Sequence, residues 1–88
     1  MRVAVLYYSN SEQERTVLEF EHDYEHVTGR KLTLYDLNTI EGTEMASLYD
    51  VVQYPAVLAI SNDGQMLKLW QGEILPLMNE VMYYDQPD

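Results

Sequence analysis

Apolar and polar positions alternate along the chain in short segments that predict strands and helices. Residues 2–8 are almost entirely apolar, which is typical of a central strand covered on both faces. Ser9 and Ser11 follow, and each has a glutamate three residues later, the spacing of a helix capping box. Apolar residues then recur at helical spacing in one stripe: Val17, Phe20, Tyr24 and Val27. Gly29 is expected to end this helix as a left-handed cap.

The middle of the chain predicts a second strand and a short helix. Residues 31–37 form the strand, and residues 38–42 are expected to form a turn. Thr43 can then cap a helix over residues 44–49. Because a helix connects the first two strands, a right-handed crossover should make them parallel.

The last third of the chain predicts a hairpin and a closing helix. Residues 56–60 are an apolar strand, and residues 66–70 return antiparallel to it. Asn62-Asp63-Gly64 lies between them and favours a turn, because Asp-Gly tolerates positive φ. A helix over residues 74–83 follows, with Pro76 in its first turn.

The order of these segments predicts one α/β domain over residues 1–88. Its sheet has four strands in the order 2-1-3-4, is mixed in direction, and carries helices on both faces. The polar tail over residues 85–88 is expected to fray.

The residues around Pro55 carry a distinctive pattern. The segment is Tyr49-Asp50-Val51-Val52-Gln53-Tyr54-Pro55-Ala56-Val57. It consists of a tyrosine, a short linker, a bulky residue, a proline and the start of an apolar strand. Together with the turn at residues 62–64 and Gly72, this pattern resembles the thioredoxin-like superfamily. The resemblance extends over nearly the whole chain. It implies a minimal, glutaredoxin-sized thioredoxin-like fold in which Pro55 is the cis-proline.

The same resemblance shows which chemistry is missing. The family's spacing puts the C-x-x-C motif at Ser11-Glu12-Gln13-Glu14 and the buried acid of its proton transfer at Val5. The chain has no cysteine, so it cannot carry out thiol–disulfide exchange by itself. A serine in the nucleophile's place needs an adjacent base, and no histidine is expected near it. We therefore expect no catalytic residue and no oxidoreductase activity.

The resemblance also implies a binding groove at one edge of the sheet. In thioredoxin-like proteins this groove holds an extended peptide or glutathione through the backbone of the residue before the cis-proline, which here is Tyr54. The candidate groove residues are Tyr8, Ser9, Ser11, Tyr54 and Pro55. A purely structural interpretation stays open, in which a serine only caps the helix and the tyrosines fill the surface.

Two histidines suggest a metal site that other features argue against. His22-Asp23-Tyr24-Glu25-His26 matches the H-x-x-E-H pattern of inverted zincins, whose histidines can share a metal ion. With Tyr24 and Val27 facing the core, however, His22 and His26 turn towards solvent, and no third protein ligand can be named. We expect a solvated helix face, with no metal and no cofactor.

Charge and hydropathy narrow the range of partners. Fifteen acidic residues against five basic ones give a net charge of −10. This charge disfavours nucleic acid and anionic membranes. It either keeps the surfaces of separate molecules apart by like charge, which is the more common reason for such acidity, or favours a basic protein partner. The N-terminal apolar run is too short for a signal peptide, and no stretch approaches the roughly 20 apolar residues of a membrane span. The expected compartment is the cytoplasm.

Three functions fit these observations. The leading hypothesis is a redox-inactive thioredoxin-fold module that binds a protein or peptide. The alternative is a small-ligand protein of the glutathione-binding type or a degenerate transferase, which would need a cation in the groove for the ligand's carboxylates. The third is assembly, because the open sheet edges at residues 31–37 and 65–71 could pair across a homodimer.

Overall fold

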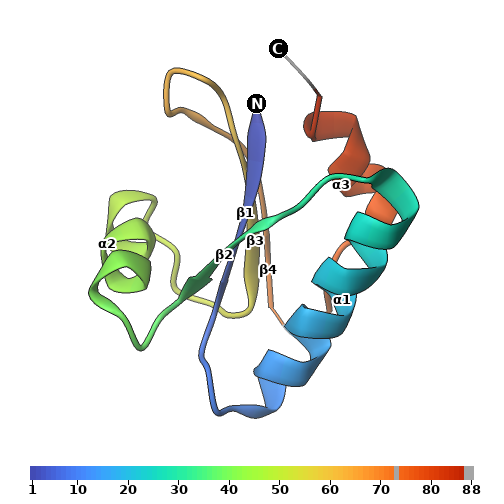
Figure 1. The fold of residues 1–88 in the computed structure, drawn as a ribbon. Helices are drawn as coiled ribbons and strands as arrows, with labels where there is room; N and C mark the ends of the chain where they lie inside the picture. Colours follow the sequence, from blue (N-terminus) through green and yellow to red (C-terminus); the bar gives the residue numbers. More distant parts are fainter. Residues whose placement is uncertain (73, 87–88) are drawn as a thin grey trace.

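A mixed four-stranded sheet forms the centre of the molecule, for which a computed structural model describes residues 1–72 and 74–86 (Figure 1). The strands lie in the order β2-β1-β3-β4. β1 is parallel to β2 and antiparallel to β3, and β4 is antiparallel to β3. The predicted α/β class and strand order are therefore confirmed. The elements are β1 (Arg2–Tyr7), α1 (Glu12–Thr28), β2 (Thr33–Asp36), α2 (Ile40–Leu48), β3 (Ala56–Ile60), β4 (Met66–Gln71) and α3 (Met78–Tyr84).

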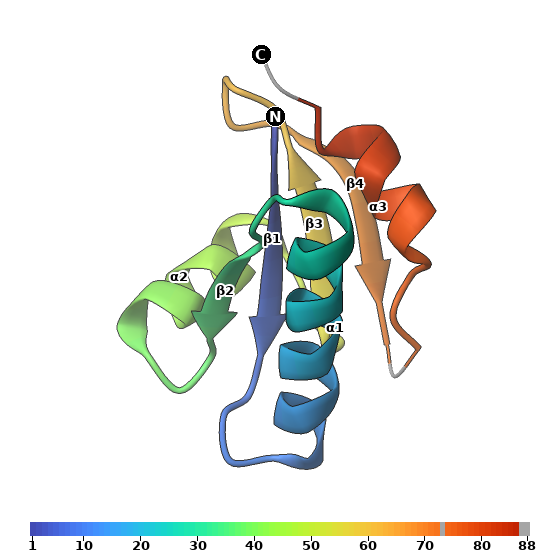
Figure 2. The same cartoon turned by 45° about the vertical axis from the view of Figure 1, so that its right-hand side comes forward.

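Helices cover both faces of the sheet, as predicted. α1 and α3 lie on one face and α2 lies on the other (Figures 1 and 2). Each interface is filled by buried apolar side chains, to which β1 and β3 contribute alternate residues. This two-sided burial explains why both strands are continuously apolar. The buried cluster under α1 and α3 is Val3, Val5, Val17, Tyr24, Leu32, Val57 and Val81. Under α2 it is Ala4, Leu6, Leu37, Ala46, Val51, Ala56, Leu58 and Ile60.

α1 has the predicted caps but not the whole predicted stripe. Ser11 is its N-cap, and Gly29 ends it with φ 74°. Val27, expected to face the core, is 63% exposed. At about 100° per residue, the next inward position after Tyr24 is Thr28. The Thr28 hydroxyl donates to the Tyr24 carbonyl at 2.6 Å, so a polar side chain completes the inward face.

α2 begins earlier than predicted, at Ile40. Thr39, not Thr43, is the cap, because its hydroxyl accepts a hydrogen bond from the Gly42 amide at 3.2 Å. Gly42 therefore lies inside the helix rather than in a turn. A Cβ at this position would overlap the main-chain carbonyl of Asp36, so the glycine permits α2 to approach the end of β2. Both threonines are of a residue type that caps helices, so the residue type alone does not distinguish them.

α3 begins later than predicted, at Met78 rather than near residue 74. Pro76 disfavours helical backbone at Leu75, the residue before it, so a helix is not expected to run through this position. Leu77, after Pro76, is still extended with φ −70° and ψ 148°. The predicted helical start thus becomes part of the connection from β4. In the part of the chain that the structure describes, no helix has the length and apolar character to cross a membrane.

Asp85 is buried, which contradicts the prediction of a frayed tail. The residue as a whole is 6% exposed, and its side chain is 3% exposed. The carboxylate accepts from the Tyr24 hydroxyl at 2.8 Å and forms an ion pair of 2.9 Å with the Arg30 guanidinium. These contacts join the ends of α1 and α3. Residues 87 and 88 of the predicted tail lie outside the described residues.

Candidate functional site

The first turn of α1 and the loop before β3 meet beside the end of β1, where they form an open groove of about 470 Å³. The Tyr54–Pro55 peptide bond in this loop is cis, as predicted. Three of the predicted site residues line the groove directly: Ser11, Tyr54 and Pro55. Glu12, Gln13 and Thr16 complete the lining.

Tyr8 borders this groove, whereas Ser9 belongs to another contact. The rings of Tyr8 and Tyr54 pack edge to face, with centroids 5.4 Å apart. The Ser9 amide instead donates to an Asp36 carboxylate oxygen at 3.1 Å. Its carbonyl and hydroxyl accept from the Asn38 side chain at 3.0 and 2.9 Å. Hydrogen bonds from Ser9, and then from the Asn38 amide, lower the pKa of the Asp36 carboxyl. Ser9 therefore joins two loops.

The Ser11 hydroxyl caps α1 and also bonds to the residue after β1. It donates to the Tyr8 carbonyl at 2.5 Å and accepts from the Gln13 amide at 3.2 Å. His22, eleven positions further along the same helix, is about 16 Å away along its axis. A base that could activate Ser11 would have to lie within hydrogen-bond reach. Ser11 therefore has a structural role, and no histidine lies close enough to activate it as a nucleophile.

Sequence reasoning missed three residues that line the groove, Glu12, Gln13 and Thr16, and of these Gln13 contacts both Tyr8 and Tyr54. Its side-chain oxygen accepts from the Tyr8 amide at 3.3 Å, and its side-chain nitrogen donates to the Tyr54 carbonyl at 3.2 Å. One carboxamide therefore bridges the main chains of the two groove walls. In the C-x-x-C spacing applied to residues 11–14, Gln13 falls on a position at which any residue is allowed, so that comparison gave no reason to select it. A carboxamide carries the same donor and acceptor as a peptide group.

The Tyr54 side chain is held in a fixed orientation at its wall of the groove. It precedes β3 and stands outside the sheet ladder. Its hydroxyl donates to the Val51 carbonyl at 2.6 Å, which anchors the ring. Burial, and then the neighbouring Tyr8, raises the pKa of the Tyr54 hydroxyl, so it is neutral at physiological pH. Among residues 1–72 and 74–86, none accepts a hydrogen bond from the Tyr54 amide.

The groove has acidic but not basic character. Glu12 is its charged lining residue, and no lysine or arginine lines it among the described residues. The start of α1 also has few free donors, because the amides of Gln13 and Glu14 already bond to Ser11. An anionic ligand would therefore find neither a cation nor an open helix terminus.

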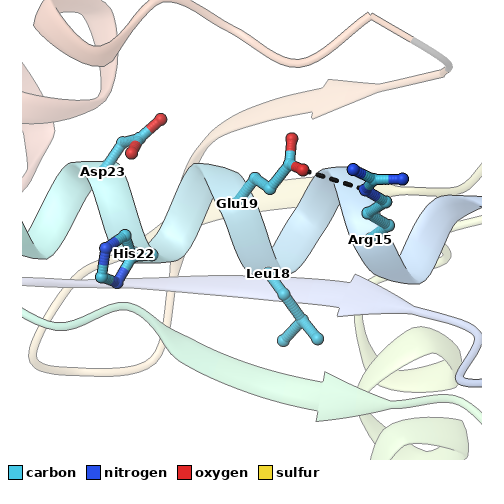
Figure 3. A pocket seen from close by; sticks show the side chains of 5 residues that line it. All are labelled: Arg15, Leu18, Glu19, His22 and Asp23. Carbon is cyan, nitrogen blue, oxygen red and sulfur yellow. Dashed lines mark hydrogen bonds and ion pairs between the residues drawn. The ribbon is translucent and has the colours of Figure 1, made fainter.

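A second depression lies on the outer face of α1 (Figure 3). Its volume is about 490 Å³, and all of its lining residues come from this one helix: Arg15, Leu18, Glu19, His22 and Asp23. Arg15 and Glu19 form an ion pair of 3.1 Å across it. His22 and His26 are exposed, as predicted. Within the described part of the chain, no three histidine or acidic side chains are grouped to hold a metal ion. With no second wall, this depression is the weaker candidate.

Comparisons with known proteins add no family and no function to this geometry. The chain matches no protein-family model, no curated protein and no solved structure. Its functional assignment therefore depends on the groove between Tyr8, Gln13 and Tyr54.

Proposed function

We propose that the protein is a redox-inactive member of the thioredoxin-like superfamily that binds an extended segment of a protein or peptide. The observation that carries this proposal is the position of the Gln13 carboxamide. It makes two hydrogen bonds, one from the Tyr8 amide and one to the Tyr54 carbonyl. A backbone peptide group has the same donor and acceptor and could take both partners. The chain has no cysteine with which to act on such a ligand.

Binding would proceed by short β-pairing with the segment before β3. A ligand N–H would donate to the Tyr54 carbonyl, and ligand C=O groups would accept from the Tyr8 and Tyr54 amides. Gln13 would rotate into solvent to release its partners. The exposed ring of Tyr8, which packs against Tyr54, would supply an apolar wall for a neighbouring ligand side chain.

Charge favours a basic partner. Glu12 lines the groove, and the chain as a whole carries a net charge of −10. A lysine or arginine beside the paired segment of the ligand would be attracted to Glu12, and added salt would weaken that attraction. Because so few groups take part, affinity on the order of micromolar is expected.

The alternative of a glutathione-type ligand or a degenerate transferase fits the groove less well. The carboxylates of such a ligand require cations, and the described lining supplies none. A peptide requires only hydrogen bonds and an apolar wall. A small domain without disulfides also suits a reducing compartment, so the cytoplasm is the location that we propose.

Selection from a library of random displayed peptides at low salt tests the proposal. The selected peptide is resynthesised with each backbone nitrogen methylated in turn, and each version is titrated calorimetrically. Methylation of the nitrogen that donates to Tyr54 should abolish binding, and Tyr8→Ala should weaken it roughly tenfold. Tyr83→Ala is the matched control, because Tyr83 is 73% exposed on α3.

Two results would count against the proposal. One is binding that survives both Tyr8→Ala and methylation at every backbone nitrogen, because the groove would then not be the contact surface. The other is tight glutathione binding that competes with the peptide, which would favour the alternative.

A further inference from the structure

The outer edge of β2 has backbone groups that no neighbouring strand covers. β2 is the first strand in the sheet order, so β1 is its one described neighbour. The Leu37 amide donates to the Tyr7 carbonyl at 2.7 Å across this pair. Because backbone direction alternates along a strand, Leu34 and Asp36 turn their amides away from β1. The Leu34 carbonyl faces outward too, whereas the Asp36 carbonyl already accepts from Thr39.

α2 forms a wall beside this free edge. Four of its residues recur at positions i, i+3, i+4 and i+7 and thus share one face: Glu41, Glu44, Met45 and Leu48. With Tyr35 of β2 they line a depression of about 250 Å³. Met45 and Tyr35 are partly buried, but Leu48 is 69% exposed. The depression therefore combines an apolar floor with two carboxylates.

We propose that this edge groove binds an extended segment of another protein, which pairs with Leu34 as a fifth strand. Side chains of such a segment alternate between the two faces of the sheet. Those on the α2 side would meet Leu48, Met45 and Tyr35 at one position and the carboxylates at a neighbouring one. The fitting ligand therefore has an apolar residue and a basic residue two positions apart. This site shares no lining residue with the groove at Tyr54 and is independent of it.

Charge argues for a different protein rather than a second copy of this chain. A second β2 edge would bring its own Glu41 and Glu44 against the first pair, and each copy carries a net charge of −10. Like charges brought together across an interface disfavour association. The β4 edge of another copy carries Lys68 and apolar residues and so matches the groove better. Pairing of β2 with β4 is head-to-tail, however, and it leaves one unpaired edge at each end of the assembly instead of a closed dimer. Self-association is therefore an outcome that the test must detect.

The probe is the blocked peptide Thr-Lys-Thr-Leu-Thr-Lys-Thr, whose lysines and leucine lie on one face of a strand. It is titrated into the isotopically labelled protein and followed by NMR. We expect the Leu34 and Asp36 amides to shift and to gain protection from hydrogen exchange. Two controls should bind at least about fivefold more weakly: Thr-Lys-Leu-Thr-Thr-Lys-Thr, which moves leucine to the other face, and Thr-Asp-Thr-Leu-Thr-Asp-Thr, which reverses the charge.

Variants of exposed residues identify the surface. Leu48→Ser and the double variant Glu41→Gln/Glu44→Gln should each weaken binding about fivefold or more. The matched control Glu21→Gln/Asp23→Asn removes the same two charges from α1, on the other face of the sheet, and should change affinity by less than about twofold. Tyr8→Ala should leave binding unchanged.

Four results would overturn the inference. If Glu41→Gln/Glu44→Gln and Glu21→Gln/Asp23→Asn weaken peptide binding equally, the peptide is attracted only by the net charge of the protein. Shifts centred on Gln13 and Tyr54 would assign the peptide to the other groove. Sedimentation that shows oligomers, with Leu34 protected before any peptide is added, would make a second copy the occupant. If the Leu34 amide resonance does not shift when the matched peptide is added, the edge groove does not bind such a segment.

Discussion

The Gln13 side chain bonds to the two main-chain groups of the groove that a peptide would use, so its removal should strengthen peptide binding. In Gln13→Ala the Tyr8 amide and the Tyr54 carbonyl lose their intramolecular partner. A ligand would then no longer have to displace the carboxamide. Because two hydrogen bonds contribute about 1 kcal/mol each, peptide affinity should rise by up to about thirtyfold.

Calorimetric titration of a selected peptide measures this change. Gln71→Ala is a suitable control, because Gln71 is an exposed glutamine on β4 outside the groove. Weaker peptide binding in Gln13→Ala, with Gln71→Ala unchanged, would show that Gln13 contacts the ligand rather than competing with it.

Tyr24 makes the stability of the protein sensitive to alkaline pH. Burial, and then its hydrogen bond to Asp85, raises the pKa of the Tyr24 hydroxyl above the usual 10.0. The folded state therefore favours the neutral phenol. This contribution is fully present below pH 10 and is lost as pH rises through the higher folded pKa. The free energy of unfolding should accordingly decline above pH 10.

The variant Tyr24→Phe tests this assignment. Urea denaturation at neutral pH should show a loss of about 1–2 kcal/mol, because Asp85 stays buried without the phenol as its donor. The decline above pH 10 should be smaller than in the parent chain. Tyr83→Phe, which removes an exposed hydroxyl, should leave both quantities unchanged. An identical alkaline decline in Tyr24→Phe would assign it to other groups.

At the scale of elements, the approach of α2 to β2 depends on Gly42. Glycine to alanine inside a helix is ordinarily stabilising by about 1 kcal/mol. Here the new methyl group would overlap the Asp36 carbonyl, which is main chain and cannot rotate away. We expect Gly42→Ala to lower the free energy of unfolding by about 1–3 kcal/mol.

Chemical denaturation with circular dichroism detection measures this loss. Ser47→Ala lies on an exposed position of the same helix and should stabilise it by a few tenths of a kcal/mol. Stabilisation by Gly42→Ala of the size that helix propensity alone predicts would mean that α2 does not approach Asp36 this closely.

At the scale of the whole molecule, the net charge of −10 should oppose folding at low ionic strength. Sodium chloride screens repulsion between exposed carboxylates, which outnumber basic residues fifteen to five. Raising salt from about 0.01 M to about 0.15 M should therefore raise the thermal midpoint by a few degrees. Differential scanning calorimetry measures this, and Glu21→Gln/Asp23→Asn should reduce the salt effect. A midpoint that falls with salt would show that the ion pairs outweigh the repulsion.

Local patterns were enough to predict much of this architecture. The cap at Gly29 and the turn before Gly64 depend on a few backbone dihedrals, and β3 has the predicted bounds because its residues are all apolar. Ser11 was one of two capping candidates from spacing alone. Tyr54 and Pro55 were selected for the candidate groove because residues 49–57 resemble the pattern around the cis-proline of thioredoxin-like proteins.

The remaining features depend on which distant groups meet in the folded chain. Ser9 has the residue type and spacing of a cap, but its amide bonds to Asp36, 27 positions away. Asp85 belongs to a polar tail in the sequence, yet it lies 61 positions from its partner Tyr24 and is buried beside it. Burying a polar side chain is costly unless it forms a hydrogen bond, so a buried polar group pairs with a group that lies near it in the folded structure. Tertiary packing, and not the neighbouring sequence, determines which group that is.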